Sequence, residues 1–178
     1  MYLSLKVQHA SRILISSLLI LLSSKLAAQG LPGTENGEWR YLGGDSGNTR
    51  YSPLNQINAS NFSDLEQAWI WHSDNFGPNL DYFSRSTPVY VDGMLYTVAT
   101  PRRQVIAMDP ATGENIWTFR EPDTIRHQRS PRQAYGKGVA YAEVDGRGVV
   151  YITTPGFFLW ALDAKTGKPL ETGENRFR

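Results

Sequence analysis

The stretch Ala107-Met108-Asp109-Pro110-Ala111-Thr112-Gly113-Glu114-Asn115-Ile116-Trp117 is followed further along the chain by Ala161-Leu162-Asp163-Ala164-Lys165-Thr166-Gly167-Lys168. In both copies an aspartate opens a turn that ends in Thr-Gly. The aspartate can accept hydrogen bonds from N–H groups of the turn, the threonine hydroxyl can add another, and glycine tolerates the positive φ of the corner. The pattern therefore predicts two copies of one tight turn between strands.

Short runs of strand-forming residues surround both turns. Asp92-Gly93 separates two such runs, and Asp-Gly is the strongest two-residue hairpin signal. Residues 66–71 also alternate, with Ala68 and Ile70 on one face and Trp69 and Trp71 on the other, and are interpreted as a strand that can bury both faces. The other expected strands are 87–91, 94–99, 105–108, 115–119, 139–143, 149–154 and 158–162. The sequence therefore predicts an all-β chain.

These strands repeat with a period of about 54 or 55 residues, which is typical of the four-stranded blades of a β-propeller with long loops. Trp117 follows the first turn, where its ring can lie flat between adjacent blades while its N–H donates a hydrogen bond. A blade cannot bury both faces alone, and a ring needs about four to eight blades. Residues 66–178 supply about two blades and one stray strand. We therefore expect a propeller that is truncated at its C-terminus.

The N-terminal residues 1–28 have the three-part pattern of a secretory signal peptide: basic residues without acids, an apolar run, and Leu26-Ala27-Ala28. The run from Ile13 to Leu22 is about half the length of about 20 residues that spans a bilayer. Cleavage after Ala28 is therefore the preferred interpretation, and an uncleaved membrane anchor is the alternative. In either case the predicted location is periplasmic or secreted.

Residues 29–65 are rich in Gly, Asn, Ser and Pro and have no sustained period. They predict an N-terminal arm that lies over the domain surface and is held by its aromatic residues. Within the arm, residues 58–65 predict a short helix, with Asn58 or Ser60 as its N-cap.

Charge and composition exclude several classes of protein. Residues 1–28 contain three of the 18 Lys and Arg and none of the 17 Asp and Glu, so the rest of the chain has a formal charge of −2. Phosphate neutralisation needs a concentrated basic face, so no nucleic-acid partner is expected. The sequence has no cysteine, which excludes disulfides and cysteine-based zinc sites, and its three histidines are too far apart to predict a metal site.

The repeated turn and its tryptophan resemble the tryptophan-docking repeat of the eight-bladed quinoprotein alcohol and glucose dehydrogenases, which use pyrroloquinoline quinone (PQQ). The stretch from Trp39-Arg40-Tyr41 to Gln56-Ile57-Asn58 and the spacing Leu65-x-x-Ala68-Trp69-x-Trp71 also resemble this family. The resemblance covers roughly residues 37–170. The second repeat departs from it, because Glu171 stands where tryptophan would be.

The resemblance implies a PQQ-dependent dehydrogenase that oxidises an alcohol or sugar hydroxyl, with a respiratory quinone or cytochrome as electron acceptor. In the family, PQQ lies over the ring axis, calcium polarises its carbonyl, and an aspartate acts as base. Calcium ligands and base come from later blades, so no catalytic or metal residue is expected before Arg178, and this part alone is expected to be inactive. Residues 66–71 would close the ring, and residues 120–138 would lie on the cofactor face.

Three cations are the candidates for binding the PQQ carboxylates. Lys137 matches a family arginine that precedes a Gly-x-x-Tyr strand start, and it keeps the charge without the bidentate fork. Arg132 follows Pro131 where methanol-dehydrogenase-like members carry two adjacent cysteines, a departure that resembles the glucose- and sugar-type branch. Arg85 stands where many members carry an acid. Each of the three can equally be a solvated loop charge.

Two other functions remain open. A non-catalytic propeller scaffold, such as an outer-membrane assembly factor, explains the repeated turns and Trp117 equally well but accounts less well for the arm and for residues 120–138. A carbohydrate-binding module with exposed Trp and Tyr is the third interpretation. Asp81, Asp123 and Asp145 are interpreted as turn-shaping residues without chemistry.

Overall fold

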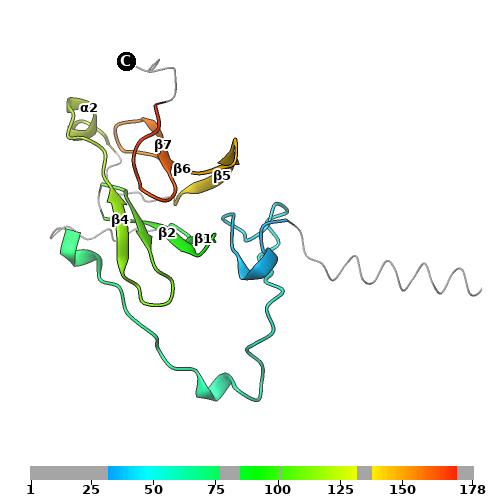
Figure 1. The fold of residues 1–178 in the computed structure, drawn as a ribbon. Helices are drawn as coiled ribbons and strands as arrows, with labels where there is room; N and C mark the ends of the chain where they lie inside the picture. The colour runs from blue at the N-terminus through cyan, green and yellow to red at the C-terminus, as the bar shows by residue number, and fades with distance from the viewer. Residues whose placement is uncertain (1–31, 77–84, 101, 132–137, 172–178) are drawn as a thin grey trace, which may run out of the picture.

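The computed structural model describes residues 32–76, 85–100, 102–131 and 138–171. Two antiparallel sheets stand next to each other (Figure 1). The first has the order β1-β2-β3-β4, with β1 Val89–Val91, β2 Met94–Ala99, β3 Gln104–Met108 and β4 Asn115–Phe119. The second has the order β5-β6-β7, with β5 Ala140–Val144, β6 Arg147–Thr153 and β7 Leu159–Asp163. The all-β prediction and the two successive sheets are confirmed.

Two-residue hairpins join the first two strands of each sheet. Asp92 and Gly93 have φ values of 51° and 76°, and the equivalent Asp145 and Gly146 have φ values of 51° and 73°. Positive φ at both central residues defines the turn whose twist matches that of the flanking strands. The prediction that Asp92-Gly93 forms a hairpin is therefore confirmed, as is the turn-shaping role of Asp145.

The repeated Asp-Thr-Gly turns are also built as predicted. Asp109 Oδ1 accepts from the N–H groups of Ala111 and Thr112, at 2.7 and 3.2 Å. Asp163 Oδ1 accepts from Lys165 N at 3.1 Å and Thr166 N at 2.9 Å, and also from the Thr166 hydroxyl at 2.9 Å. The closing glycines, Gly113 and Gly167, have φ values of 72° and 68°. Each turn follows the third strand of its sheet, β3 or β7, and reverses the direction of the chain.

Trp117 joins the two sheets at this second turn. Its indole N–H donates to the carbonyl oxygen of Ala164 at 2.9 Å, and its ring lies so close to Gly167 that a Cβ there would overlap it. The hydroxyl of Tyr96 donates to the same carbonyl at 3.1 Å. The predicted placement of the tryptophan ring between neighbouring sheets is therefore confirmed. The shared core holds residues of both sheets, among them Val98, Val105, Ala107, Val150, Ile152 and Leu162.

Trp69 docks on the first turn in the same way as Trp117 docks on the second. Its indole N–H donates to the carbonyl oxygen of Pro110 at 3.0 Å, and a Cβ on Gly113 would lie 2.7 Å from its ring. Trp71 donates to Asn115 Oδ1 at 2.9 Å. The segment before the first sheet therefore supplies the same docking contact that the first sheet supplies to the second.

Residues 66–71 form no strand within the described part of the chain, and their pairing with a last blade stays a prediction. These residues have no strand pairing with any described residue, and the side chain of Ile70 is 61% exposed, so only the tryptophan face is covered. Alternation reports which side chains share a face, whereas a strand also needs a neighbouring backbone to bond with. The predicted helix at residues 58–65 is reduced to the 3-10 turn Phe62–Asp64, with Asn61 before it.

The arm begins with a compact segment, residues 32–50, which lies beside β1 and β5 (Figure 1). Trp39 pairs with Tyr90 of β1 through two backbone hydrogen bonds of 2.8 and 3.0 Å. Arg40 forms ion pairs with Glu38 and, at 3.1 Å, with Glu143 of β5. This segment therefore connects β1 of the first sheet to β5 of the second. Residues 1–28 lie outside the described residues, and among those described no helix is long and apolar enough to cross a membrane.

The second turn makes stability depend on pH. The hydroxyl of Thr166, together with the two turn N–H groups, lowers the pKa of Asp163 below the usual value of an aspartate. A group whose pKa is lowered by folding stabilises the protein fully above its unfolded pKa, and this contribution is lost as the pH falls through the folded pKa. We therefore expect the turn to loosen below about pH 4. Titration of the Asp163 carboxyl by NMR checks this, and an ordinary aspartate pKa would contradict it.

Candidate functional site

The two ends of the sheets differ in structure and chemistry. The antiparallel registers put the start of β1, the end of β2, the start of β3 and the end of β4 at one end, together with the start of β5, the end of β6 and the start of β7. We call this the loop end and define it by the described residues in 85–88, 99–104, 119–131, 138–139 and 153–159. The opposite turn end holds the four short turns at 92–93, 109–114, 145–146 and 163–168.

Contacts between the two sheets hold the loop end together. Gly138, just before β5, lies against the backbone of Ser86 and Thr87, just before β1, since a Cβ on it would stand 3.6 Å from the Thr87 carbonyl oxygen. The guanidinium of Arg103 donates to the carbonyl oxygen of Thr153 at 3.3 Å. The starts of β1 and β5, the first strands of the two sheets, therefore lie close together at this end.

Buried polar side chains gather at the loop end. Eight polar or charged residues are buried among those described, and two of them, Thr34 and Asp45, belong to residues 32–50 of the arm. The other six all lie at the loop end: Thr100, Gln104, Glu121, His127, Ser130 and Thr154. Because burying a polar group is costly unless it is satisfied, such a concentration at one end indicates a specific role there.

The buried atoms Thr100 Oγ1, Arg102 Nη1 and Glu121 Oε1 of the loop end have no hydrogen-bond partner among the described residues. They come from the β2–β3 connection and from the segment after β4. They include a hydroxyl, a guanidinium donor and a carboxylate acceptor, which can serve a polar ligand or residues outside the described ranges. The loop end therefore offers hydrogen-bonding capacity that the described part of the fold does not use.

The segment after β4 carries a short helix, α2 Ile125–Gln128, whose N-cap Thr124 accepts from the N–H of His127 at 3.2 Å. Just before it, Asp123 accepts from Arg102 at 2.9 Å, and its other oxygen lies 3.6 Å from His127 Nδ1. The hydrogen bond from Arg102 lowers the pKa of Asp123 below its usual value. Asp123 thus joins two loops by an ion pair, whereas the sequence suggested only a turn. Asp81 lies outside the described residues.

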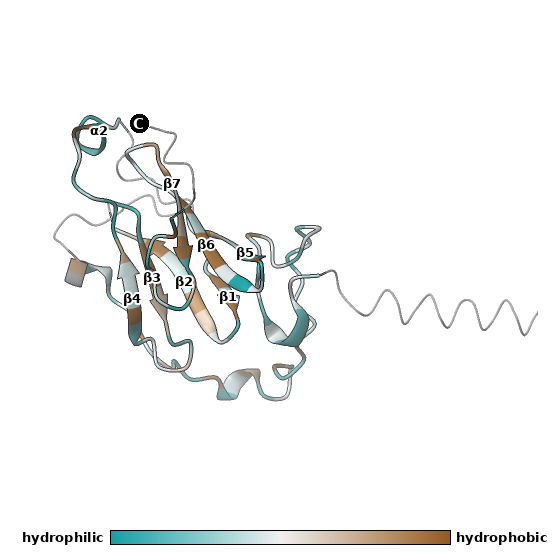
Figure 2. Ribbon diagram, turned by 45° about the horizontal axis from the view of Figure 1, so that its top comes forward, coloured by the Kyte–Doolittle hydropathy of each residue, from teal (hydrophilic) through white to brown (hydrophobic). Residues whose placement is uncertain are grey.

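The two ends also carry opposite charge. The described residues of the loop end contain two acids, Glu121 and Asp123, against six arginines: Arg85, Arg102, Arg103, Arg120, Arg126 and Arg129. The four turns of the turn end contain five acids, Asp92, Asp109, Glu114, Asp145 and Asp163, against Lys165 and Lys168. Figure 2 shows hydrophobic residues along the strands and a hydrophilic segment between β4 and α2. A concentrated field of one sign attracts ligands of the opposite sign, so the loop end favours an anion.

Of the three predicted cofactor-binding residues, only Arg85 falls within the described ranges. It is exposed at the loop end, four residues before β1, and its neighbour Ser86 donates to the Val98 carbonyl oxygen at 3.0 Å. Arg132 and Lys137 lie outside the described residues. Sequence analysis missed Glu121, His127 and Thr154, whose burial depends on contacts between segments distant in sequence. The described parts of the segment 120–138 lie at the loop end, and its place on a cofactor face stays a prediction.

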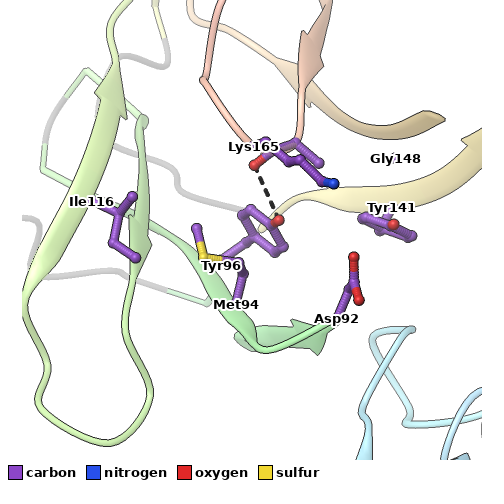
Figure 3. A pocket seen from close by; sticks show the side chains of 8 residues that line it. Asp92, Met94, Tyr96, Ile116, Tyr141, Gly148 and Lys165 are labelled. Carbon is purple, nitrogen blue, oxygen red and sulfur yellow. Dashed lines mark hydrogen bonds between the residues drawn. The ribbon is translucent and has the colours of Figure 1, made fainter.

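A hollow of about 190 Å³ at the turn end has a different character (Figure 3). Tyr96, Tyr141, Met94 and Ile116 line it, with Asp92 and Lys165 at its edge. The Tyr96 hydroxyl already donates to Ala164, and burial raises its pKa. Its buried hydroxyl is thus satisfied, which fits a packing gap between the sheets. Among the described residues no group of three His, Asp or Glu side chains could hold a metal ion at either end.

Comparison with known proteins gives the family. Residues 39–175 match the model of the glucose/ethanol/alcohol dehydrogenase β-propeller domain, a PQQ family. The chain belongs to this PQQ-dependent dehydrogenase β-propeller family. It is 37% identical to the quinohemoprotein alcohol dehydrogenase ADH IIB of Pseudomonas putida over 136 residues. These residues cover 75% of this chain and 18% of that protein. The quinoprotein glucose dehydrogenase A of Acinetobacter calcoaceticus is 31% identical over 121 residues, 66% of this chain and 15% of that protein.

A solved structure shows the same arrangement of strands. The crystal structure of the quinohemoprotein alcohol dehydrogenase from Comamonas testosteroni superposes with a TM-score of 0.59 at 32% sequence identity, over 82% of this chain and 21% of that chain. This chain therefore spans about a fifth of the length of the relatives it matches. The identities to the alcohol dehydrogenases exceed the identity to the glucose dehydrogenase. The comparisons therefore do not support the predicted glucose- or sugar-type branch.

Proposed function

We propose that the loop end of this chain forms part of the cofactor face of a PQQ-dependent dehydrogenase that oxidises an alcohol hydroxyl. The observation that carries the proposal is the excess of arginines over acids at the loop end, where β1 and β5 begin. It is joined there by the six buried polar residues, which we call the polar floor. PQQ carries carboxylates, and cations that converge from loops are the groups that bind carboxylates in proteins. The family relation makes this quinone the expected anion.

The residues suited to hold PQQ are Arg85 and, from the sequence, Arg132 and Lys137. The described strand starts support a grouping of Arg85 with Lys137, since Gly138 directly follows Lys137 and lies against Ser86, which directly follows Arg85. Bound PQQ would supply the two-electron oxidising power. The chain's own contribution is to neutralise and orient the carboxylates through these cations and to exclude water with the buried floor. We assign no base and no calcium ligand to this chain.

The substrate and the electron acceptor follow from the relatives as proposals. The alcohol dehydrogenases share more identity with this chain than the glucose dehydrogenase does, which favours an alcohol over a sugar. The 34% identical 1-butanol dehydrogenase (cytochrome c) of Thauera butanivorans and the 37% identical alcohol dehydrogenase (quinone) of Gluconacetobacter polyoxogenes name different acceptors, so we propose a cytochrome or a quinone as acceptor. We also propose that residues 1–28 direct export to the periplasm. N-terminal sequencing of the exported protein tests cleavage after Ala28.

Titration of the full-length protein with PQQ in the presence of calcium, followed by absorbance, tests the proposed site. We expect Arg85→Ala to weaken PQQ binding by about tenfold, which corresponds to the loss of about 1.4 kcal/mol from one charge-assisted contact. The control is Lys168→Ala, which removes an exposed cation from the turn end and is expected to leave PQQ affinity unchanged. Equal effects of the two substitutions, or no binding of PQQ by the unaltered protein, would contradict the proposal and favour a scaffold.

A further inference from the structure

Glu121 is a carboxylate buried at the loop end without a described cation to pair with it. It follows the end of β4 by two residues, and it is only 2% exposed. Its Oε2 accepts from the backbone N–H of Gly156, in the β6–β7 connection of the other sheet, at 3.1 Å. A carboxylate taken out of water is costly unless it is well hydrogen-bonded, so this contact between two sheets calls for a purpose beyond packing.

Gly156 is shaped to receive this side chain. A Cβ on Gly156 would overlap Glu121 Oε1, so only glycine lets the carboxylate lie over the backbone at this point. The contact joins residues that are 35 positions apart in sequence. It therefore ties the segment after β4 of the first sheet to a particular turn of the second.

The turn that Glu121 holds is itself tightly organised. Thr154 N donates to the Phe158 carbonyl oxygen at 2.9 Å, and Phe157 N donates to the Thr154 carbonyl oxygen at 3.0 Å. Phe157 has a φ of 62°, which costs energy for a residue other than glycine and persists only where its surroundings hold it. The same segment after β4 makes a second contact with this turn, because the Arg126 guanidinium lies 4.3 Å from the centre of the Phe158 ring.

We infer that Glu121 is a positioning residue for the PQQ site: through Gly156 it fixes the turn 154–158 of the second sheet against the loop end of the first. Thr154, which is 2% exposed, belongs to this turn and to the polar floor of the loop end. If the turn moves, the floor and the spacing between the strand starts of the two sheets change with it. The inference rests on the proposed function, since it concerns the same site.

The contact between Glu121 and Gly156 needs an acceptor oxygen and does not need the negative charge. Glu121→Gln keeps one amide oxygen that can accept from Gly156 N, whereas Glu121→Ala removes the acceptor. We expect Glu121→Ala to weaken PQQ binding by about tenfold, on the scale of one lost buried hydrogen bond, and Glu121→Gln to stay within about threefold of the unaltered protein. Gly156→Ala is expected to match Glu121→Ala, because it pushes the same carboxylate away. Glu114→Ala, an exposed glutamate at the turn end, is the matched control and is expected to have no effect.

Two readouts are needed, PQQ affinity by titration and hydrogen exchange of the Gly156 amide. Exchange should be slow in the unaltered protein and in Glu121→Gln, and faster in Glu121→Ala. An Ala variant with a fast Gly156 amide and normal PQQ affinity would overturn the inference, and so would a Gln variant as impaired in PQQ binding as the Ala variant. If Glu121→Ala does not fold, Glu121→Gln and Gly156→Ala give the same comparison. Failure of the proposed function would show differently, as absent PQQ binding in the unaltered protein beside a protected Gly156 amide.

Discussion

Replacement of Trp117 by alanine is expected to lower the free energy of unfolding by about 3–5 kcal/mol, the range for removing a large buried aromatic side chain. The ring is 9% exposed and lies between the sheets, against Gly167 and 5.9 Å from the Tyr96 ring. Its removal leaves a cavity at the contact through which the first sheet reaches the second. Urea denaturation followed by circular dichroism measures the change.

Two controls separate the ring from its hydrogen bond. Trp117→Phe keeps an aromatic ring and loses the N–H, and we expect a cost of about 1 kcal/mol from the bond together with a smaller packing loss, because Ala164 O still accepts from Tyr96. Trp71→Ala removes an indole that is only partly buried and whose N–H donates to Asn115 in an exposed contact, so its cost should be clearly smaller. A Trp117→Ala variant no less stable than Trp71→Ala would contradict the role given to Trp117.

The turns could be read from the sequence because their chemistry is local. Asp109 and Asp163 accept hydrogen bonds from N–H groups two and three residues further along the chain, and the closing glycines take positive φ in both copies. Every partner in such a turn lies within a few positions, so spacing alone specifies it. The repeat then predicted that successive sheets pack on each other, because four short strands cannot bury both faces of one sheet.

The same reasoning does not reach contacts whose partner is distant in sequence. Residues 66–71 alternate as a strand does, but what fixes them is the docking of Trp69 on Pro110, 41 residues away. Nothing in the sequence singles out Glu121, because its burial depends on a glycine in the second sheet. A single sequence carries no direct signal for such pairings. The candidate cations were chosen by resemblance alone, and of these the structure locates Arg85 at the loop end.

Gly167→Ala is the second substitution for which we expect a large effect. The residue has a φ of 68°, where an L side chain costs about 1–2 kcal/mol, and its added Cβ would overlap the Trp117 ring, which adds the cost of overpacking. Together we expect a loss of about 2–5 kcal/mol in the free energy of unfolding. Gly146 is the matched control, because its φ of 73° is similar and nothing lies within 4 Å of an added Cβ. Gly146→Ala should therefore cost only the backbone part.

The double variant tests whether the two residues act as one contact. In a Trp117→Ala background the ring is absent, so Gly167→Ala should cost no more than Gly146→Ala does, about 1–2 kcal/mol. The two losses should then sum to more than the loss of the double variant, since residues in direct contact are not additive. The same denaturation measurement on the four proteins of the cycle gives the coupling. Strict additivity would mean that the ring of Trp117 does not lie on Gly167, and the docking of the first sheet on the second turn would have to be abandoned.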